Sequence, residues 1–361
     1  MDRIEEFVIS PLSNESQASF NITLDVTDNS THGELTTPTI PMVVKAMDHY
    51  GVPVICVLGI IGDVTSLLVF VCTSYRYQPC SQYLAALALV DTLFLVSTLL
   101  LSFMALFPAI SMLPYYCSVV VYMSYIGSFL SAWYVVLMMT ERSIVVCFPF
   151  KASFLCNRKK SFIVISMTTL LALILYSHSF FTTITAHPRC EVNYSYYEFL
   201  SYFTYVDTFL VFVVPFFSVV GLNLKIILTI RKFRRHHGHF NHSVRMLQRN
   251  NSAENTLTLA QVRSTKLLVW VSSVFILLYM PSYVARLCGI LLAKIYGENY
   301  TNTTNSHFYV AQSVCQLLYY LKFCIDFVVY IITSNNFRRN FTKCLTSTEA
   351  TEKGFRYRYR S

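Results

Sequence analysis

The sequence predicts an all-α fold: a seven-transmembrane helix bundle followed by a short amphipathic eighth helix. Of the 361 residues, 54% are hydrophobic and only 13% are charged, whereas soluble domains carry about 25% charged residues. The apolar residues gather in seven blocks of about 20 residues or more, and each block is long enough to cross a bilayer as a helix. A transmembrane barrel would need short segments of alternating hydrophobicity, which the sequence lacks.

The distribution of basic residues gives the orientation of the predicted spans. These spans are, in chain order, Val52–Thr73, Ser81–Leu106, Val119–Cys147, Phe162–Ile184, Phe203–Ile230, Leu267–Ala293 and Phe308–Thr333. Basic residues lie in alternate connections, including the run "RKFRR" (231–235), so their common face is expected to be cytoplasmic. We therefore expect a multi-pass plasma-membrane protein with an extracellular N-terminus. The net charge of +9 favours anionic lipid and an intracellular partner over nucleic acid.

Four regions follow from this topology. Residues 1–50 are expected to be an extracellular, glycosylated, disordered tail, and residues 51–334 the bundle. Residues 335–345 are expected to be an amphipathic helix on the membrane surface, and residues 346–361 a cytoplasmic tail. The glycosylation sequons on the predicted outside are Asn14, Asn21, Asn29, Asn193, Asn299 and Asn302.

Cysteine usage predicts one disulfide. Most of the eleven cysteines lie within spans or on the inner side, but Cys117 and Cys190 both fall on the predicted outside. That compartment is oxidising, so we expect these two to be bonded. The sequence has no phosphate-binding loop, paired catalytic acids or metal-ligand cluster, so we expect no enzyme activity, no cofactor and no metal site.

The end of the third span, "MMTERSIVVCFPF", carries Glu141 and Arg142. With Cys117 at the start of the same span, this pattern resembles the rhodopsin-like class (class A) of G-protein-coupled receptors. The resemblance runs from about residue 52 to residue 345 and includes "LALVDTLF", "FILLYMPSY" and "DFVVY". It implies that Arg142 pairs with Glu141 at rest and meets a heterotrimeric G protein on activation. The other residues of this switch would be Asn223, Gln261 and Tyr330.

The departures from the class pattern point to one branch of it. Asp326-Phe327 stands where the class has Asn-Pro, and Tyr279 stands where it has Trp. Phe at this place is a feature of FMRFamide-receptor-like neuropeptide receptors, which are the nearest likeness. The segment "NNFRRNFTKC" resembles the eighth helix of the class and makes Cys344 a palmitoylation candidate.

A buried polar network is expected in the middle of the bundle. Lys322 and Asp326 share one helix face, and the resemblance directs both towards Asp91, with Asp63 and Ser131 nearby. Many relatives hold sodium here, and our hypothesis is that the Lys322 ammonium replaces it. One ammonium cannot neutralise three carboxylates, so at least one of them should carry a proton. The alternative is a structural ion pair without a signalling role.

The ligand should bind in the outer half of the bundle. Ser124 stands where amine receptors have aspartate, which disfavours an amine ligand. Glu191, Glu198 and Glu298 on the outer side favour a basic peptide, such as one ending in Arg-Phe-amide. Each aromatic residue is alternatively a packing or interface residue. The candidate ligand-binding residues are Ser124, Tyr125, Tyr279, Tyr283, Arg286, Gln316 and Tyr320.

Two alternatives share some of these features. A chemosensory receptor for small molecules would have the same fold and differ in the ligand site. A transporter would explain charges at mid-membrane, but no inverted repeat is evident. Ser and Thr in the loop 231–266 and in "LTSTEATEKG" are candidate phosphorylation sites, which makes arrestin and a receptor kinase further expected partners.

Overall fold

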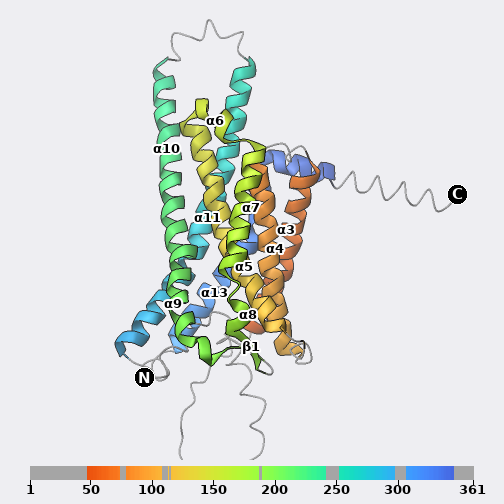
Figure 1. Ribbon diagram of the computed structural model, residues 1–361. Helices are drawn as coiled ribbons and strands as arrows, with labels where there is room; N and C mark the ends of the chain where they lie inside the picture. Colours follow the sequence, from red (N-terminus) through yellow and green to blue (C-terminus); the bar gives the residue numbers. More distant parts are fainter. Residues whose placement is uncertain are drawn as a thin grey trace, which may run out of the picture.

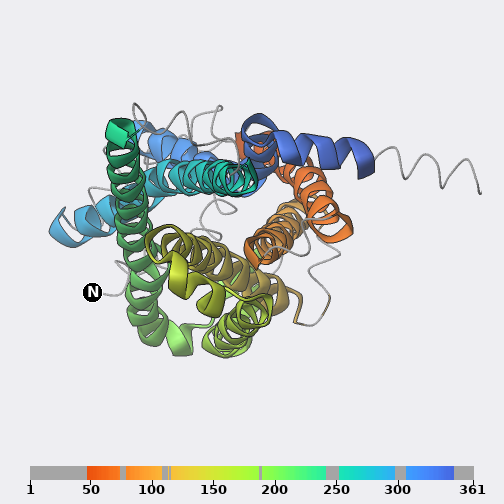
Figure 2. The same ribbon diagram turned by 90° about the horizontal axis from the view of Figure 1, so that it is seen from above.

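The computed structural model describes residues 47–73, 79–107, 113, 115–186, 189–240, 252–296 and 306–344. Within these residues, seven helices are long and apolar enough to cross a membrane. They run side by side along a common direction (Figure 1) and surround a shared axis when seen from above (Figure 2). The predicted seven-span helical bundle is therefore confirmed.

The spans have the following bounds. The first four are α3 (Val52–Cys72), α4 (Pro79–Leu106), α5 (Tyr116–Cys147) and α7 (Arg158–Leu175). The fifth is continuous through α9 (Tyr197–Thr208), the π-helical turn η5 (Phe209–Val213) and α10 (Val214–Phe240). The last two are α11 (Ser252–Tyr296) and α13 (Ser306–Thr333). The shorter helical elements are η1 (Met47–Gly51), α6 (Pro149–Leu155), α8 (Ser179–Thr182) and η4 (Tyr194–Tyr196).

The predicted fourth and fifth spans are wrong at their outer ends. Helix α7 ends at Leu175, and Ile184 belongs to β1 (Thr183–Ala186), which pairs antiparallel with β2 (Arg189–Val192). Hydropathy does not detect this boundary, because the β-branched run "TTIT" is as compatible with a strand as with a helix end. The fifth span begins at Tyr197, six residues earlier than Phe203, because "YEFLSY" is amphipathic rather than uniformly apolar.

Small residues allow the helices to approach closely. A Cβ on Gly59 of α3 would lie 2.4 Å from Cβ of Cys324 in α13 and 2.5 Å from Cδ1 of Leu95 in α4. A Cβ on Gly127 of α5 would lie 2.8 Å from Cβ of Phe94 in α4. Close backbone approach through small residues is a main source of helix association in membranes, where no hydrophobic driving force acts between helices.

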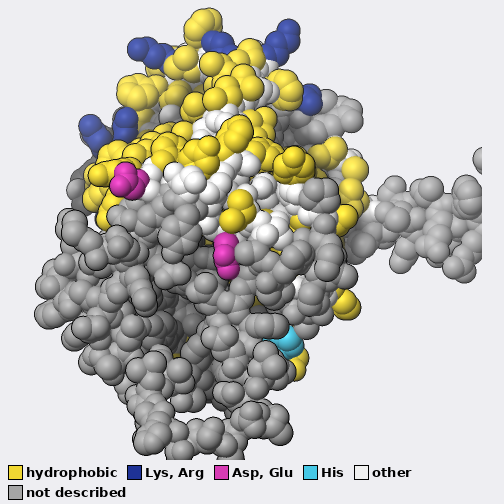
Figure 3. All heavy atoms as spheres, turned by 60° about the horizontal axis from the view of Figure 1, so that its bottom comes forward, with side chains coloured by type: hydrophobic (Ala, Val, Ile, Leu, Met, Phe, Trp, Pro, Cys, Tyr) yellow, Lys and Arg dark blue, Asp and Glu magenta, His cyan; other side chains and the backbone are white. Residues whose placement is uncertain are grey.

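The two ends of the bundle differ in charge and structure. The hairpin β1–β2 lies at one end, whereas α6, the C-terminal end of α10 and the N-terminal end of α11 lie at the other (Figure 1). The second end carries the exposed basic residues Lys151, Arg158, Lys159 and Arg231. Hydrophobic side chains cover the walls of the bundle, and acidic side chains lie on the outer face that Figure 3 turns towards the viewer. This distribution fits a cytoplasmic basic end in a multi-pass plasma-membrane protein.

A further helical segment follows the last span. After Ser334, residues 335–344 are helical and leave the bundle at a steep angle to the spans (Figures 1 and 2). The ring of Phe337 is buried against Phe70 and Tyr330, with ring centroids 5.5 Å apart in both pairs. The location of this segment on the membrane surface stays a prediction.

Candidate functional site

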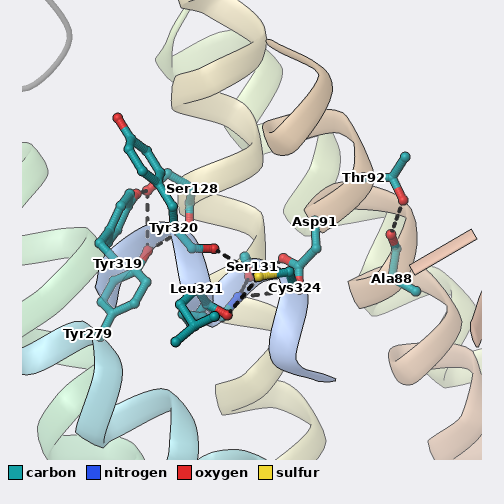
Figure 4. Close-up of polar contacts among 11 residues, drawn as sticks. Ala88, Asp91, Thr92, Ser128, Ser131, Tyr279, Tyr319, Tyr320, Leu321 and Cys324 are labelled. Atoms are coloured by element: carbon teal, nitrogen blue, oxygen red, sulfur yellow. Dashed lines mark hydrogen bonds and ion pairs between the residues drawn. The ribbon is translucent and has the colours of Figure 1, made fainter. Parts of the chain in front are cut away.

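Three helices bring a charged pair and a hydroxyl together inside the bundle. Lys322 on α13 places Nζ 3.2 Å from Oδ1 and 3.4 Å from Oδ2 of Asp91 on α4. Ser131 on α5 donates a hydrogen bond of 2.5 Å to Oδ1 of Asp91, and Lys322 also donates to Ser131 (Figure 4). The ammonium lies 4.2 Å from the ring centroid of Phe323. The lysine is therefore held by a carboxylate, a hydroxyl and an aromatic face.

Two more carboxyl groups adjoin this pair. Asp326, one turn after Lys322, is buried and interacts electrostatically with Asp91 and Lys322. That one of the carboxyl groups carries a proton stays a prediction. Asp63 on α3 is buried, and neither of its oxygens has a hydrogen-bond partner among the described residues, although it interacts electrostatically with Asp91, Asp326 and Lys322.

Lys322 occupies the carboxylate of Asp91, and its replacement of a sodium ion stays a prediction. The ammonium of Lys322 contacts both oxygens of Asp91, the carboxylate that would have to hold the ion. In the part of the chain that the structure describes, no group of three or more His, Cys, Asp or Glu side chains is arranged to hold a metal.

At the cytoplasmic end, Glu141 and Arg142 are both buried in the last turns of α5. Nε of Arg142 donates to Sγ of Cys80 at 3.0 Å, and Ser161 donates to Oε2 of Glu141 at 3.4 Å. Cys156, just after α6, donates to the backbone oxygen of Glu141, and burial raises the pKa of this thiol. The Arg142 side chain is therefore anchored to the start of α4 through its Nε atom. 

The remaining switch residues have different surroundings. Asn223 on α10 and Ser272 on α11 exchange hydrogen bonds of 2.9 and 3.0 Å, and both side chains are buried. Within the part of the chain that the structure describes, the buried hydroxyl of Tyr330 has no hydrogen-bond partner, although its ring packs edge-on against Phe70. Gln261 belongs to α11, but its side chain lies outside the described residues.

A hydroxyl cluster lies under the outer half of the bundle. Ser128 on α5 is 2.8 Å from the hydroxyl of Tyr319 on α13 and 3.2 Å from that of Tyr279 on α11 (Figure 4). The ring of Tyr279 stacks between Phe275, at 4.6 Å, and Tyr283, at 5.2 Å. This cluster links three helices at the place where the receptor class has a Trp.

The other predicted ligand residues divide into two groups. Ser124 and Tyr320 are buried, and the Ser124 hydroxyl donates to Ser97 of α4 at 2.9 Å. Tyr125, Arg286 and Gln316 are only partly buried. Partial burial leaves the second group better placed to meet a ligand.

Sequence analysis missed four residues of this region. Ser128 and Tyr319 complete the hydroxyl cluster, and Asp207 on α9 accepts a hydrogen bond of 2.6 Å from the hydroxyl of Tyr176. Asp207 could have been found from the sequence, because it is an ionisable residue within an apolar span, as Lys322 is. Ser128, Tyr176 and Tyr319 have no comparable signal in the sequence.

The predicted disulfide between Cys117 and Cys190 is present, with an S–S distance of 2.10 Å. It ties β2 to the first turn of α5, and Ser118 adds a hydrogen bond of 3.0 Å to the backbone oxygen of Thr183 in β1. The hairpin is thereby fastened over the outer end of the bundle.

The predicted modification sites are only partly within the described residues. Asn193 follows β2 and is partly exposed, and Cys344 ends the last helical segment. The other glycosylation candidates, which are Asn14, Asn21, Asn29, Asn299 and Asn302, lie outside the described residues. Glycosylation and palmitoylation stay predictions.

Seven spans, a disulfide-tied outer hairpin and an Arg at the inner end of the third span define a seven-transmembrane receptor. The profile of the family described as 7 transmembrane receptor (rhodopsin family) matches residues 62–330, and the chain belongs to this family. The family is one of receptors rather than of enzymes.

Among individual proteins, the chain is similar to the human thyrotropin-releasing hormone receptor, with 26% identity over 91% of this chain and 87% of that receptor. The mouse thyrotropin-releasing hormone receptor is also 26% identical, over 85% of this chain and 81% of that receptor. The rat somatostatin receptor type 4 is 23% identical, over 81% of this chain and 70% of that receptor.

Proposed function

We propose that this protein is a G-protein-coupled receptor that binds an extracellular peptide and activates a heterotrimeric G protein. Family membership is the observation that carries the proposal. The relatives named for thyrotropin-releasing hormone and somatostatin support a hormone-type peptide as the ligand. The aromatic and charged residues of the outer half, which include Tyr125, Tyr283 and Arg286, favour the same ligand class.

Activation would pass from the outer half to the inner end through hydrogen bonds between helices. A ligand that displaces Tyr283 or Tyr279 would loosen the hydroxyl cluster around Ser128. Helix α11 would then turn or move outward, which requires the mutual hydrogen bonds of Asn223 and Ser272 to break. In the final step, Arg142 would leave Cys80 and contact the G protein, because a guanidinium offers several donors in one plane.

Lys322 would act as a built-in counter-cation in this scheme. Its ammonium neutralises Asp91 permanently, so the resting state would need no sodium ion. The alternative, a structural ion pair without a signalling role, predicts that neutral substitutions change stability alone.

A screen tests the proposed function. Synthetic C-terminally amidated peptides are applied to cells that carry the receptor and report both calcium and cyclic AMP. We expect at least one peptide to give a response that Arg142→Ala abolishes at unchanged surface expression. Activation by small odorants or nutrients and by no peptide would instead establish a chemosensory receptor. Solute uptake that persists in Arg142→Ala would establish a transporter.

Three further partners belong to this proposal. Arrestin and a receptor kinase would act on Ser and Thr of the cytoplasmic segments. Anionic lipid would contact the basic cytoplasmic end, where each Lys or Arg near such a surface contributes about 1 kcal/mol of binding.

A further inference from the structure

We propose that Asp207 is the docking point for a positively charged group of the ligand, and that Arg286 receives a carbonyl or carboxylate of the same ligand. The inference rests on the proposed function and narrows the ligand to a cationic peptide with a nearby acceptor group.

Asp207 is a buried acid that makes no direct ion pair with any residue that the structure describes. It lies in the last turn of α9, is 6% exposed, and accepts a hydrogen bond of 2.6 Å from Tyr176 on its Oδ1 atom. A phenol donates a hydrogen bond to the carboxyl group but brings no positive charge to it. An acid that is buried without a compensating cation is costly, and such residues within spans mark functional sites.

Aromatic rings pack around Tyr176, the tyrosine that donates to this carboxylate. Tyr125 of α5 stacks on Tyr176 with ring centroids 5.4 Å apart and planes 4° apart, and Phe203 of α9 packs edge-on against Tyr176 at 5.9 Å. On α11, Tyr283 stacks on Phe212 at 4.8 Å and interacts electrostatically with Asp207. Ring faces attract cations, and they discriminate against anions.

Arg286 carries the opposite charge but does not bind the carboxyl group of Asp207 directly. It interacts electrostatically with Asp207, but the described residues contain no direct ion pair between the two side chains. Both charges therefore stay available to a partner that reaches them together. A peptide can do so with an Arg or Lys side chain and a backbone or terminal oxygen.

The local backbone holds Asp207 in position. The π-helical turn η5 begins two residues after it, and Nε1 of Trp133 on α5 donates to the backbone oxygen of Leu210 at 3.1 Å. π-Helical turns within long helices occur frequently at functional sites.

Matched peptides test the inference. Amidated peptides containing one Arg are paired with peptides in which citrulline replaces that Arg, which keeps the shape and removes the charge. On the wild-type receptor, we expect the Arg peptide to be at least tenfold more potent in the calcium or cyclic AMP assay. Asp207→Asn should abolish this preference. Tyr176→Phe retains the carboxylate, so it should keep the preference, and Tyr205→Phe, an exposed tyrosine of α9, serves as the control.

The outcomes separate this inference from the proposed function. Equal potency of both peptides on the wild type overturns the role of Asp207, while the peptide receptor stands. A wild-type receptor that reaches the cell surface and answers no peptide overturns the proposed function and this inference with it. A preference for the Arg peptide that persists in Asp207→Asn at normal surface expression also overturns the role of Asp207. If Asp207→Asn does not reach the surface, equal potency of the two peptides on the wild type still overturns the inference. Asp207→Glu, which keeps the charge, should retain the preference.

Discussion

Nζ of Lys322 lies 3.2 Å from Oδ1 of Asp91, and the two side chains are only 2% and 0% exposed. The pair joins the last span to the second one in the middle of the bundle. Removing one partner of a buried ion pair costs about 3–5 kcal/mol, because the other charge is left without compensation. The same contact occupies the carboxylate that a cation would otherwise neutralise.

Lys322→Asn is therefore expected to make receptor stability depend on sodium. The purified wild type should unfold at the same temperature in sodium chloride and in the chloride of an impermeant organic cation. The variant should be less stable than the wild type without sodium and should recover when sodium is added, because the ion can then approach Asp91. Asp91→Asn combined with Lys322→Asn is the control and should not respond. A wild-type melting temperature that rises with sodium would refute the role of Lys322.

Ser272→Ala is expected to raise basal signalling. The substitution removes both hydrogen bonds between Asn223 and Ser272, each of which contributes about 0.5–1.5 kcal/mol to the resting arrangement of α10 and α11. Basal cyclic AMP and calcium are measured at matched surface expression. Ser273→Ala is a close control, because the Ser273 hydroxyl donates to Val269 within its own helix. Equal basal signals in the two variants would count against a restraint at this position.

Tyr279→Phe is expected to weaken the hydroxyl cluster without creating a cavity. The lost hydrogen bond to Ser128 should lower the free energy of unfolding by about 1 kcal/mol, measured by thermal or denaturant unfolding of the purified receptor. Tyr319→Phe should have a similar effect, and the two should be non-additive, because both hydroxyls share Ser128. Strict additivity would show that the hydroxyls act independently.

Cys190→Ser is expected to reduce both stability and ligand response. A disulfide typically contributes about 2–4 kcal/mol, and this one also fastens the hairpin over the outer end of the bundle. Surface expression and the peptide response should fall together in Cys190→Ser, and Cys117→Ser should show the same two losses. Cys288→Ser is the control, since Cys288 is an exposed free thiol. Normal expression and response in Cys190→Ser would contradict the proposed role of the hairpin.

Some features of the site could be predicted from the sequence and others could not, and the difference has a physical reason. Lys322 and Asp326 could be found without a structure, because an ionisable residue in an apolar span is costly wherever its partner lies. The same argument applies to Asp207, but the residues around it lie on other helices and could not be predicted from the sequence. The hairpin β1–β2 was not predicted, since a short apolar, β-branched run fits a strand or a helix end equally well.

Hydropathy and charge act residue by residue, so the sequence alone determined that there are seven spans, how they are oriented, and on which side of the membrane Cys117, Cys190 and Arg142 lie. The tertiary structure alone decided which side chains meet. Ser128 reaches Tyr279 and Tyr319 across more than 150 residues of chain, and Asn223 reaches Ser272 across 49. Such contacts depend on how far each helix is rotated about its own axis, and packing between neighbouring helices, rather than any local propensity, sets that rotation.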